Sequence, residues 1–474
     1  MLFNSYIFVF IFLPLVLLGW YGLNRFGKHK TAKIFLIGMS LWFYGYFNVY
    51  YLFIIVASIL INYFISYLLT FFRTKTAGRI GLLVGIGINL ALLFYFKYFD
   101  FFIENINYLF QTDFNLKHIL LPLGISFFTF QQLSFIIDRC TGKAEHYSFT
   151  NYAAFVTFFP QLIAGPIVLY KELIPQFDDP EKQKFHADNF AKGISLFVLG
   201  LGKKVLLADT LALVTNFGFE QTYFLDAPST LLVILSYTFQ IYFDFSGYSD
   251  MAIGLGKMFG FTFRENFNYP YISSSMQEFW RRWHISVSTW FKEYLYIPLG
   301  GNRKGKFRTA LNKLAVFFCT GLWHGASLNF IIWGLINGGF MMLESYKLIN
   351  TEKWLKPLRH IYTMLVTILA FVFFRADTLG DACRFIGHMF NPTGGTSEKN
   401  AMFLSQITPV YVIMFAAAII FSMPVWHTLR SKVKSKELLL YGETGSYVIS
   451  LVLLAMCIIT LSSASYNPFI YFRF

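Results

Sequence analysis

Apolar runs of about 17 to 25 residues recur along this chain, and they constrain its fold more than any other feature. A helix of about 20 residues crosses a hydrocarbon core of about 30 Å. Hydrophobic residues make up 56% of the 474 residues and charged residues only 14%, which is too little charge to cover a water-soluble protein of this length. The sequence therefore predicts an all-α polytopic membrane protein.

Some of these apolar runs are short, and two contain Pro and Gly, "LPLGISFFTFQQLSF" (121–135) and "FFPQLIAGPIV" (158–168). Such interruptions occur where a helix breaks against a protein-lined cavity. We expect about 11 to 13 transmembrane or re-entrant segments. The apolar stretches lie near 5–22, 33–48, 50–70, 80–98, 118–137, 150–168, 191–208, 229–246, 312–323, 327–345, 358–375, 407–425 and 445–463.

The net charge of +14 comes from Lys and Arg residues in short connectors. The preference for positive charge on the cytoplasmic side explains it, so no nucleic-acid partner is implied. The first basic residues, Arg25, Lys28 and Lys30, follow the first apolar run, which predicts an uncleaved first span with the N-terminus outside. The four cysteines form no CxxC pair and favour neither a metal site nor a disulfide framework.

The stretch "EFWRRWHISVSTWFKEYLYIPLGGNRKGKF" (278–307) places a histidine among tryptophans and basic residues. On a continuous helix, Trp280, His284, Ser288 and Leu295 share one aromatic face with Val287 and Phe291. One interpretation is an interfacial helix in which His284 is merely packed. The alternative is a site, because nine basic residues and only three acidic ones between 264 and 313 create a positive field that attracts phosphorylated metabolites.

The stretch "FFCTGLWHGASLNFIIWGLINGGFMML" (317–343) contains a second histidine, His324. It lies eleven residues after Lys313, which is about 16 Å along a helix and near the middle of a bilayer. Gly321 and Gly325 allow close approach to its imidazole. Burial disfavours the imidazolium, so we expect a neutral His324 that acts as a base, with a helix-packing hydrogen-bond donor as the alternative.

A third candidate is Asp244, in "YTFQIYFDFSGYSDMAIGLGKMFGF" (237–261). An intramembrane carboxylate either orients a histidine in a water-filled tunnel or forms a polar clamp between helices. Two histidines beside a basic face suggest a tunnel enzyme, in which a neutral histidine takes a proton from a hydroxyl that attacks an activated acyl group. We expect Trp280, Trp283, Trp323 and Ser288 to line or support this site.

These stretches resemble the membrane-bound O-acyltransferase superfamily, in its bacterial branch of alginate and peptidoglycan O-acetylation proteins. The likeness extends over nearly the whole chain. It is carried by "PLGISFFTFQ", "FFPQLIAGPI", "YFDFSGYSDMAIG", "RENFNYPY", "EFWRRWHISVSTWFKEYLYIPLGGNR", "GLWHGASLNFIIWG", "FFRA" and the ending "PFIYFRF".

The resemblance implies one integral-membrane domain over 1–474, a barrel-like ring of helices around a central tunnel. Within it, 262–311 would be a cytoplasmic or interfacial segment and 312–345 the catalytic segment. His324 matches the family's catalytic histidine, and His284 matches its second signature histidine.

The resemblance also implies acetyl-CoA as the donor, without a metal. We expect five basic residues to bind this donor. They are Arg281, Arg282, Arg303, Lys304 and Lys306. The acetyl group would cross the bacterial cytoplasmic membrane to a cell-surface polysaccharide, through a periplasmic or extracellular SGNH-type acyltransferase. The alternatives are a D-alanyl or longer-chain O-acyltransferase of the same superfamily, and a secondary transporter, although the sequence shows no inverted hydropathy repeat.

Overall fold

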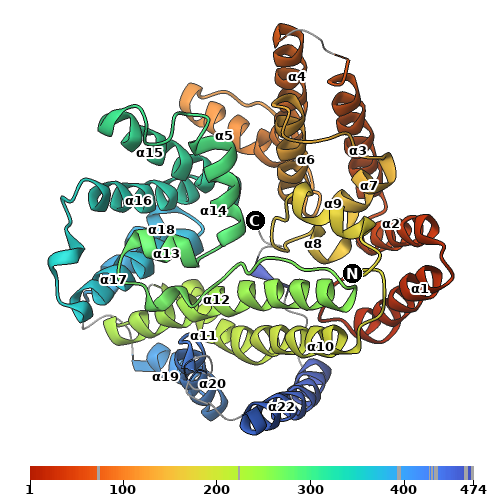
Figure 1. Ribbon diagram of the computed structural model, residues 1–474. Coiled ribbons are helices and arrows are strands. Elements are labelled where there is room, and N and C mark those ends of the chain that lie inside the picture. The colour runs from red at the N-terminus through yellow and green to blue at the C-terminus, as the bar shows by residue number, and fades with distance from the viewer. Residues whose placement is uncertain are drawn as a thin grey trace. The chain divides into compact units, whose positions relative to one another are not determined.

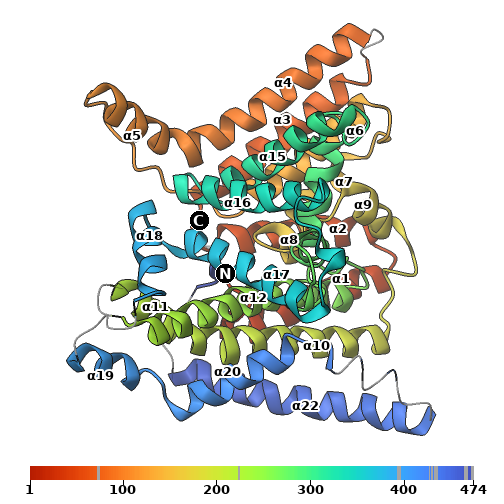
Figure 2. The same ribbon diagram turned by 90° about the vertical axis from the view of Figure 1, so that its left-hand side faces the viewer.

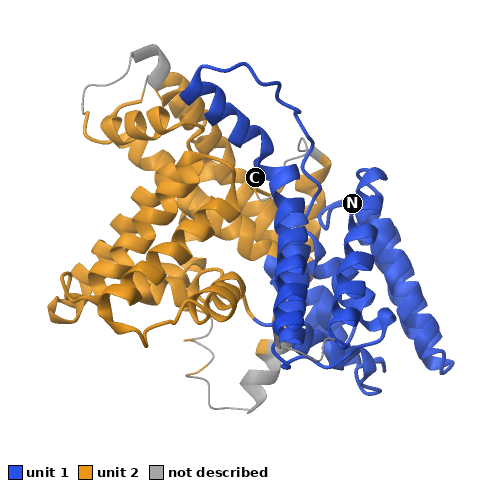
Figure 3. Ribbon diagram, turned by 90° about the horizontal axis from the view of Figure 1, so that it is seen from above, with its two compact units in different colours: residues 1–197, 249–264 blue, residues 198–248, 265–474 orange. Residues whose placement is uncertain are grey.

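The chain is predominantly helical in the part that the computed structural model describes, and no β-strand occurs there (Figure 1). This confirms the predicted all-α class. The described residues are 1–71, 75–222, 225–391, 397–425, 428, 431, 436–463 and 468–470. The last four residues of the "PFIYFRF" ending lie outside them. Two compact units are formed, one by 1–197 with 249–264 and the other by 198–248 with 265–474 (Figure 3).

The first unit contains helices from the N-terminal part of the chain. They are η1 (Phe8–Phe12), α1 (Leu13–Arg25), α2 (His29–Gly45), α3 (Tyr50–Leu68), α4 (Lys75–Leu93), η2 (Phe94–Tyr98), α5 (Phe99–Phe110), α6 (Ile125–Cys140), α7 (Phe149–Thr157), α8 (Phe159–Leu162) and α9 (Tyr170–Asp178). Two further helices, α10 (Ala187–Gly202) and α12 (Ala227–Met258), contribute residues to both units.

The second unit contains both candidate histidines. Its helices are η3 (Lys203–Ala208), α11 (Asp209–Glu220), η5 (Pro270–Ile272), α13 (Met276–Arg282), α14 (Ile285–Phe291), η6 (Lys292–Tyr296), α15 (Gly305–His324), α16 (Leu328–Ser345), η7 (Thr351–Lys353), α17 (Lys356–Arg375), α18 (Leu379–His388), α19 (Ser397–Ser405), α20 (Pro409–Phe421) and α22 (Lys436–Ser463).

Among the described residues, five helices are long and apolar enough to cross a membrane. They are Phe8–Arg25, Tyr50–Leu68, Thr76–Phe110, Lys356–Arg375 and Thr444–Ser462. Several of the other apolar stretches form shorter helices, as expected for segments that are interrupted.

The two Pro- and Gly-containing stretches are interrupted, as predicted, and they meet inside the first unit. The first becomes helical only at Ile125, after Gly124 in a left-handed conformation with φ 71°. The second begins after α7 ends, and only its residues Phe159–Leu162 are helical, as α8. A Cβ atom on Gly124 would lie 2.7 Å from the carbonyl oxygen of Leu162, so this glycine permits the two interruptions to pack backbone to backbone.

Helices α15 and α16 lie side by side and form the hairpin that carries His324 (Figures 1 and 2). Helix α15 ends at His324. Ser327 is the N-cap of α16, and its side chain accepts a hydrogen bond from the backbone N–H of Asn329. A Cβ atom on Gly321 would lie 2.3 Å from the carbonyl oxygen of Phe330 in α16. Gly321 therefore permits α15 and the backbone of α16 to pack closely.

Replacing Gly321 with alanine is expected to destabilise the protein by about 1–3 kcal/mol, because the added methyl group forces α15 and α16 apart. Gly339 on α16 is the matched control, because a Cβ atom there would meet no atom within 4 Å. Thermal unfolding of both purified variants in detergent measures the difference. Equal unfolding temperatures would contradict this account of the hairpin.

Candidate active site

The prediction of one continuous helix through Trp280 and His284 is wrong. Helix α13 ends at Arg282, Trp283 is extended, and His284 has a left-handed backbone with φ 45° before α14 begins. Such a conformation is rare for a residue other than glycine and costs of order 1 kcal/mol, so surrounding contacts must hold it.

Asn266, which precedes His284 by 18 residues, provides those contacts. Its carbonyl oxygen accepts the N–H of Ile285 at 2.9 Å. Its side-chain Oδ1 accepts the N–H of Ser286 at 3.1 Å and the hydroxyl of Ser286 at 2.9 Å. Asn266 thus pairs the backbone N–H groups that the helix break leaves open.

The same Asn266 Oδ1 lies 3.3 Å from Nδ1 of His284. The backbone N–H of Ser286 identifies this Asn266 atom as an oxygen, because a backbone donor requires an acceptor. Nδ1 of His284 therefore carries the proton, and in the neutral ring Nε2 holds the lone pair. His284 is only 1% exposed, and burial lowers its pKa to about 3, which keeps it neutral.

His324, the last residue of α15, is buried among aromatic rings at 5% exposure. Its ring centroid lies 5.0 Å from that of Trp333 and 5.1 Å from that of Phe374, both in edge-to-face geometry. The neighbouring Trp323 is 4.8 Å away. This enclosure excludes water from the imidazole, which strengthens any electrostatic interaction there.

The two histidines lie close together, with ring centroids 6.4 Å apart. Trp323 is near both, because its centroid is also 5.9 Å from that of His284. Phe245 of α12 packs edge-on against His284 at 4.5 Å. Both imidazoles can therefore reach a reacting group placed between them, which is the geometry that proton transfer by two histidines requires.

The other aromatic residues predicted for the site support its walls. Trp280 packs against Trp333 at 5.7 Å, and Trp283 stacks on Phe279 at 5.5 Å. Ser288 is half-buried in the first turn of α14, where its N–H donates to the carbonyl oxygen of His284 at 3.1 Å.

Asp244 is held in a buried ion cluster, as the clamp alternative predicts. Its Oδ1 accepts from Lys204 Nζ at 2.6 Å, and the same Lys204 pairs with Asp209 at 2.8 Å. Asp244 Oδ2 accepts the backbone N–H of Ile470 at 2.9 Å. The cluster therefore joins α12, η3 and a described part of the C-terminal segment.

The basic residues predicted to bind the donor are dispersed. Arg282 pairs with Glu278 at 2.9 Å, and Arg281 lines a polar cavity of about 470 Å³. Arg303 and Lys304 are exposed before α15. Lys306 lines an adjoining cavity of about 480 Å³.

Two lysines of this second cavity were not predicted as site residues. Lys313 and Lys347 line it together with Lys306, and Lys347 also lines the first cavity. Lys347 has a left-handed backbone with φ 58° at the end of α16, a position that glycine occupies at lower cost. A strained lysine that faces two cavities suggests a binding role, but its conformation cannot be read from sequence.

Comparison with known proteins identifies the family of the chain. The profile of the membrane-bound O-acyltransferase family matches residues 127–377, a range that includes both histidines. The chain is 37% identical to the peptidoglycan O-acetyltransferase of Helicobacter pylori, covering 100% of this chain and 98% of that protein. It is 39% identical to the probable alginate O-acetylase AlgI of Pseudomonas putida over the full length of both.

A more distant relative is the teichoic acid D-alanyltransferase of Bacillus subtilis, which is 28% identical over 53% of this chain and 66% of its own length. The relatives share O-acyl or D-alanyl transfer in their names, and the described part of this chain has several apolar helices of spanning length. The chain is therefore a multi-pass membrane acyltransferase and belongs to the membrane-bound O-acyltransferase family.

Proposed function

We propose that this acyltransferase takes an acetyl group from cytoplasmic acetyl-CoA and delivers it across the membrane for O-acetylation of a cell-surface polysaccharide, such as peptidoglycan or alginate. The observation that carries the proposal is the approach of two buried histidines to 6.4 Å inside an aromatic enclosure. The names of the full-length relatives support this class of acceptor.

The chemistry follows from the proximity of the two buried imidazoles. His324 accepts the proton of an acceptor hydroxyl as that oxygen bonds to the thioester carbonyl carbon, and the neutral His284 orients the reacting group. The carbon–sulfur bond then breaks, and the departing thiolate takes up the proton. Exclusion of water by Trp323, Trp333 and Phe374 protects the thioester from hydrolysis.

The proposal also includes the membrane location of the protein and a partner enzyme. The protein would lie in the bacterial cytoplasmic membrane with its N-terminus outside, because Arg25, Lys28 and Lys30 follow the first apolar span. A periplasmic or extracellular SGNH-type acyltransferase would receive the acetyl group and transfer it to the polysaccharide. Labelled acetyl-CoA given to purified protein, with and without such a partner, tests the donor and the partner separately.

For the donor, we propose that its phosphates bind at the cavity lined by Lys306, Lys313 and Lys347. Replacing Lys306 and Lys347 together by alanine is expected to raise the KM for acetyl-CoA about tenfold, since a charged hydrogen bond contributes about 1.5–3 kcal/mol. The value of kcat should change little, because neither histidine lines this cavity. Steady-state kinetics with purified protein measures both parameters.

Arg303 and Lys304 provide the matched comparison, because they precede the same helix and are also exposed. Their double alanine variant removes the same charge and should raise KM less than the Lys306 and Lys347 variant does. An equal increase would mean that the whole basic flank attracts the donor as a diffuse field. An unchanged KM in both variants would overturn the assignment of donor binding to this face.

The similarity to a D-alanyltransferase supports a D-alanyl thioester as a second candidate donor. A competition assay with acetyl-CoA, a long-chain acyl-CoA and a D-alanyl thioester distinguishes the three. Preferred transfer from either of the last two would replace acetyl transfer with D-alanyl or longer-chain O-acyl transfer at the same histidines.

A further inference from the structure

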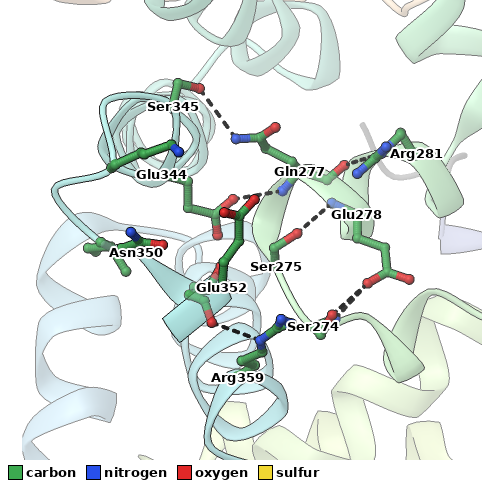
Figure 4. A pocket seen from close by; sticks show the side chains of 13 residues that line it. Ser274, Ser275, Gln277, Glu278, Arg281, Glu344, Ser345, Asn350, Glu352 and Arg359 are labelled. Carbon is green, nitrogen blue, oxygen red and sulfur yellow. Dashed lines mark hydrogen bonds between the residues drawn. The ribbon is translucent and has the colours of Figure 1, made fainter. Parts of the chain in front are cut away.

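Two polar side chains of α16 contact α13, the short helix that precedes His284. Near the end of α16, the Glu344 carboxylate accepts the N–H of Met276 at 2.7 Å. It also accepts the N–H of Gln277 at 3.1 Å (Figure 4). Two turns earlier, Asn337 Oδ1 accepts the indole N–H of Trp280 at 3.2 Å. Both polar groups are buried, Glu344 at 8% and Asn337 at 2% exposure.

These contacts complete the start of α13. The first N–H groups of a helix have no partner within it, and in a helix of seven residues they are a large share of the total. The Ser275 hydroxyl accepts the N–H of Glu278 at 3.1 Å. The Glu344 carboxylate accepts the N–H groups of the two residues before it, Met276 and Gln277. A buried carboxylate at this end also interacts favourably with the helix dipole. The position of α13 is therefore fixed by α16.

The opposite end of each helix leads to a histidine. Trp333 precedes Asn337 by four positions on α16, so the two side chains lie on the same face of this helix. Trp333 packs against both Trp280 and the imidazole of His324. Helix α13, in turn, ends two residues before His284. One face of α16 thus contacts the supports of both histidines.

We propose that Glu344 and Asn337 are positioning residues that set the separation between His284 and His324. Neither touches the reacting atoms; they act by holding α13 against α16. This inference rests on the proposed acetyl transfer between the two histidines. A misplacement of about 1 Å in such a site lowers turnover about 100-fold, so the expected effect falls on kcat.

The test compares Glu344→Ala with Glu344→Gln, which keeps an acceptor oxygen for one of the two N–H groups. Glu344→Ala should lower kcat by about 10- to 100-fold, and Glu344→Gln should recover most of it. Asn337→Leu removes the acceptor for the indole N–H of Trp280 and should lower kcat, whereas Asn337→Asp keeps an acceptor oxygen and should recover most of it. Glu352→Ala is the matched control, because this exposed glutamate lines the same cavity (Figure 4).

An unchanged kcat in Glu344→Ala, or an equal loss in the alanine and glutamine variants, would overturn the inference. A second readout does not depend on activity, namely the rate at which diethyl pyrocarbonate modifies His284, followed by mass spectrometry. His284 should react faster in Glu344→Ala than in wild type, and an equal rate would contradict its positioning. If wild-type protein transfers no acetyl group, the proposed function fails, and this second readout still decides the positioning.

Discussion

Replacing His324 with alanine is expected to lower acetyl transfer by about 10³-fold or more, because a positioned general base contributes about 10²- to 10⁴-fold. The imidazole is enclosed by Trp323, Trp333 and Phe374. Water therefore has little room to act as a substitute base. The measurement is O-acetylation of the surface polysaccharide in cells that carry the variant, at matched levels of membrane-inserted protein.

Two controls separate chemistry from packing. His324→Gln keeps most of the side-chain volume in the aromatic enclosure but provides no base, so it should be as inactive as His324→Ala. His186→Ala removes an exposed histidine of the first unit and should be fully active. Normal O-acetylation in His324→Ala would remove the histidine from the mechanism and leave it with the helix-packing alternative.

The second large effect is expected on folding, at the ion cluster of Lys204. This lysine is 1% exposed and pairs with Asp209 and Asp244. Lys204→Met leaves two carboxylates without their cation, and breaking a buried pair in this way costs about 3–5 kcal/mol. Thermal unfolding in detergent should show a large loss of stability, together with a low yield of folded protein.

The double variant Lys204→Met with Asp244→Asn should recover part of this loss, because it removes one of the two uncompensated charges. Lys192→Met is the matched surface control, since Lys192 pairs with Asp188 in an exposed i,i+4 arrangement that contributes about 0–1 kcal/mol. If Lys204→Met is no less stable than Lys192→Met, the cluster does not hold α12, η3 and the C-terminal segment together.

Several features of this fold could be predicted from local sequence. The all-α class follows from the apolar runs, and the interruptions at Gly124 and between α7 and α8 follow from Pro and Gly inside such runs. The close packing of α15 on α16 depends on Gly321, which has no side chain to separate the two helices. Each of these depends on residues close together in the sequence.

The features that could not be predicted depend on distant residues. "EFWRRWHISVSTWF" contains no Pro or Gly, and the helix breaks at His284 because Asn266, 18 residues earlier, pairs with the backbone that follows. Periodicity showed that Asp244 lies in an apolar run, which requires a partner. It could not show that the partner is Lys204, 40 residues away.

The most direct test of the account is single-turnover transfer from radiolabelled acetyl-CoA by purified protein in lipid nanodiscs, with a soluble glycan fragment and the partner acyltransferase present. Wild-type protein is expected to release CoA and label the glycan in equal amounts, and His324→Ala is expected to do neither. Glycan labelling by His324→Ala at the wild-type rate, or no use of acetyl-CoA by the wild-type protein, would contradict it.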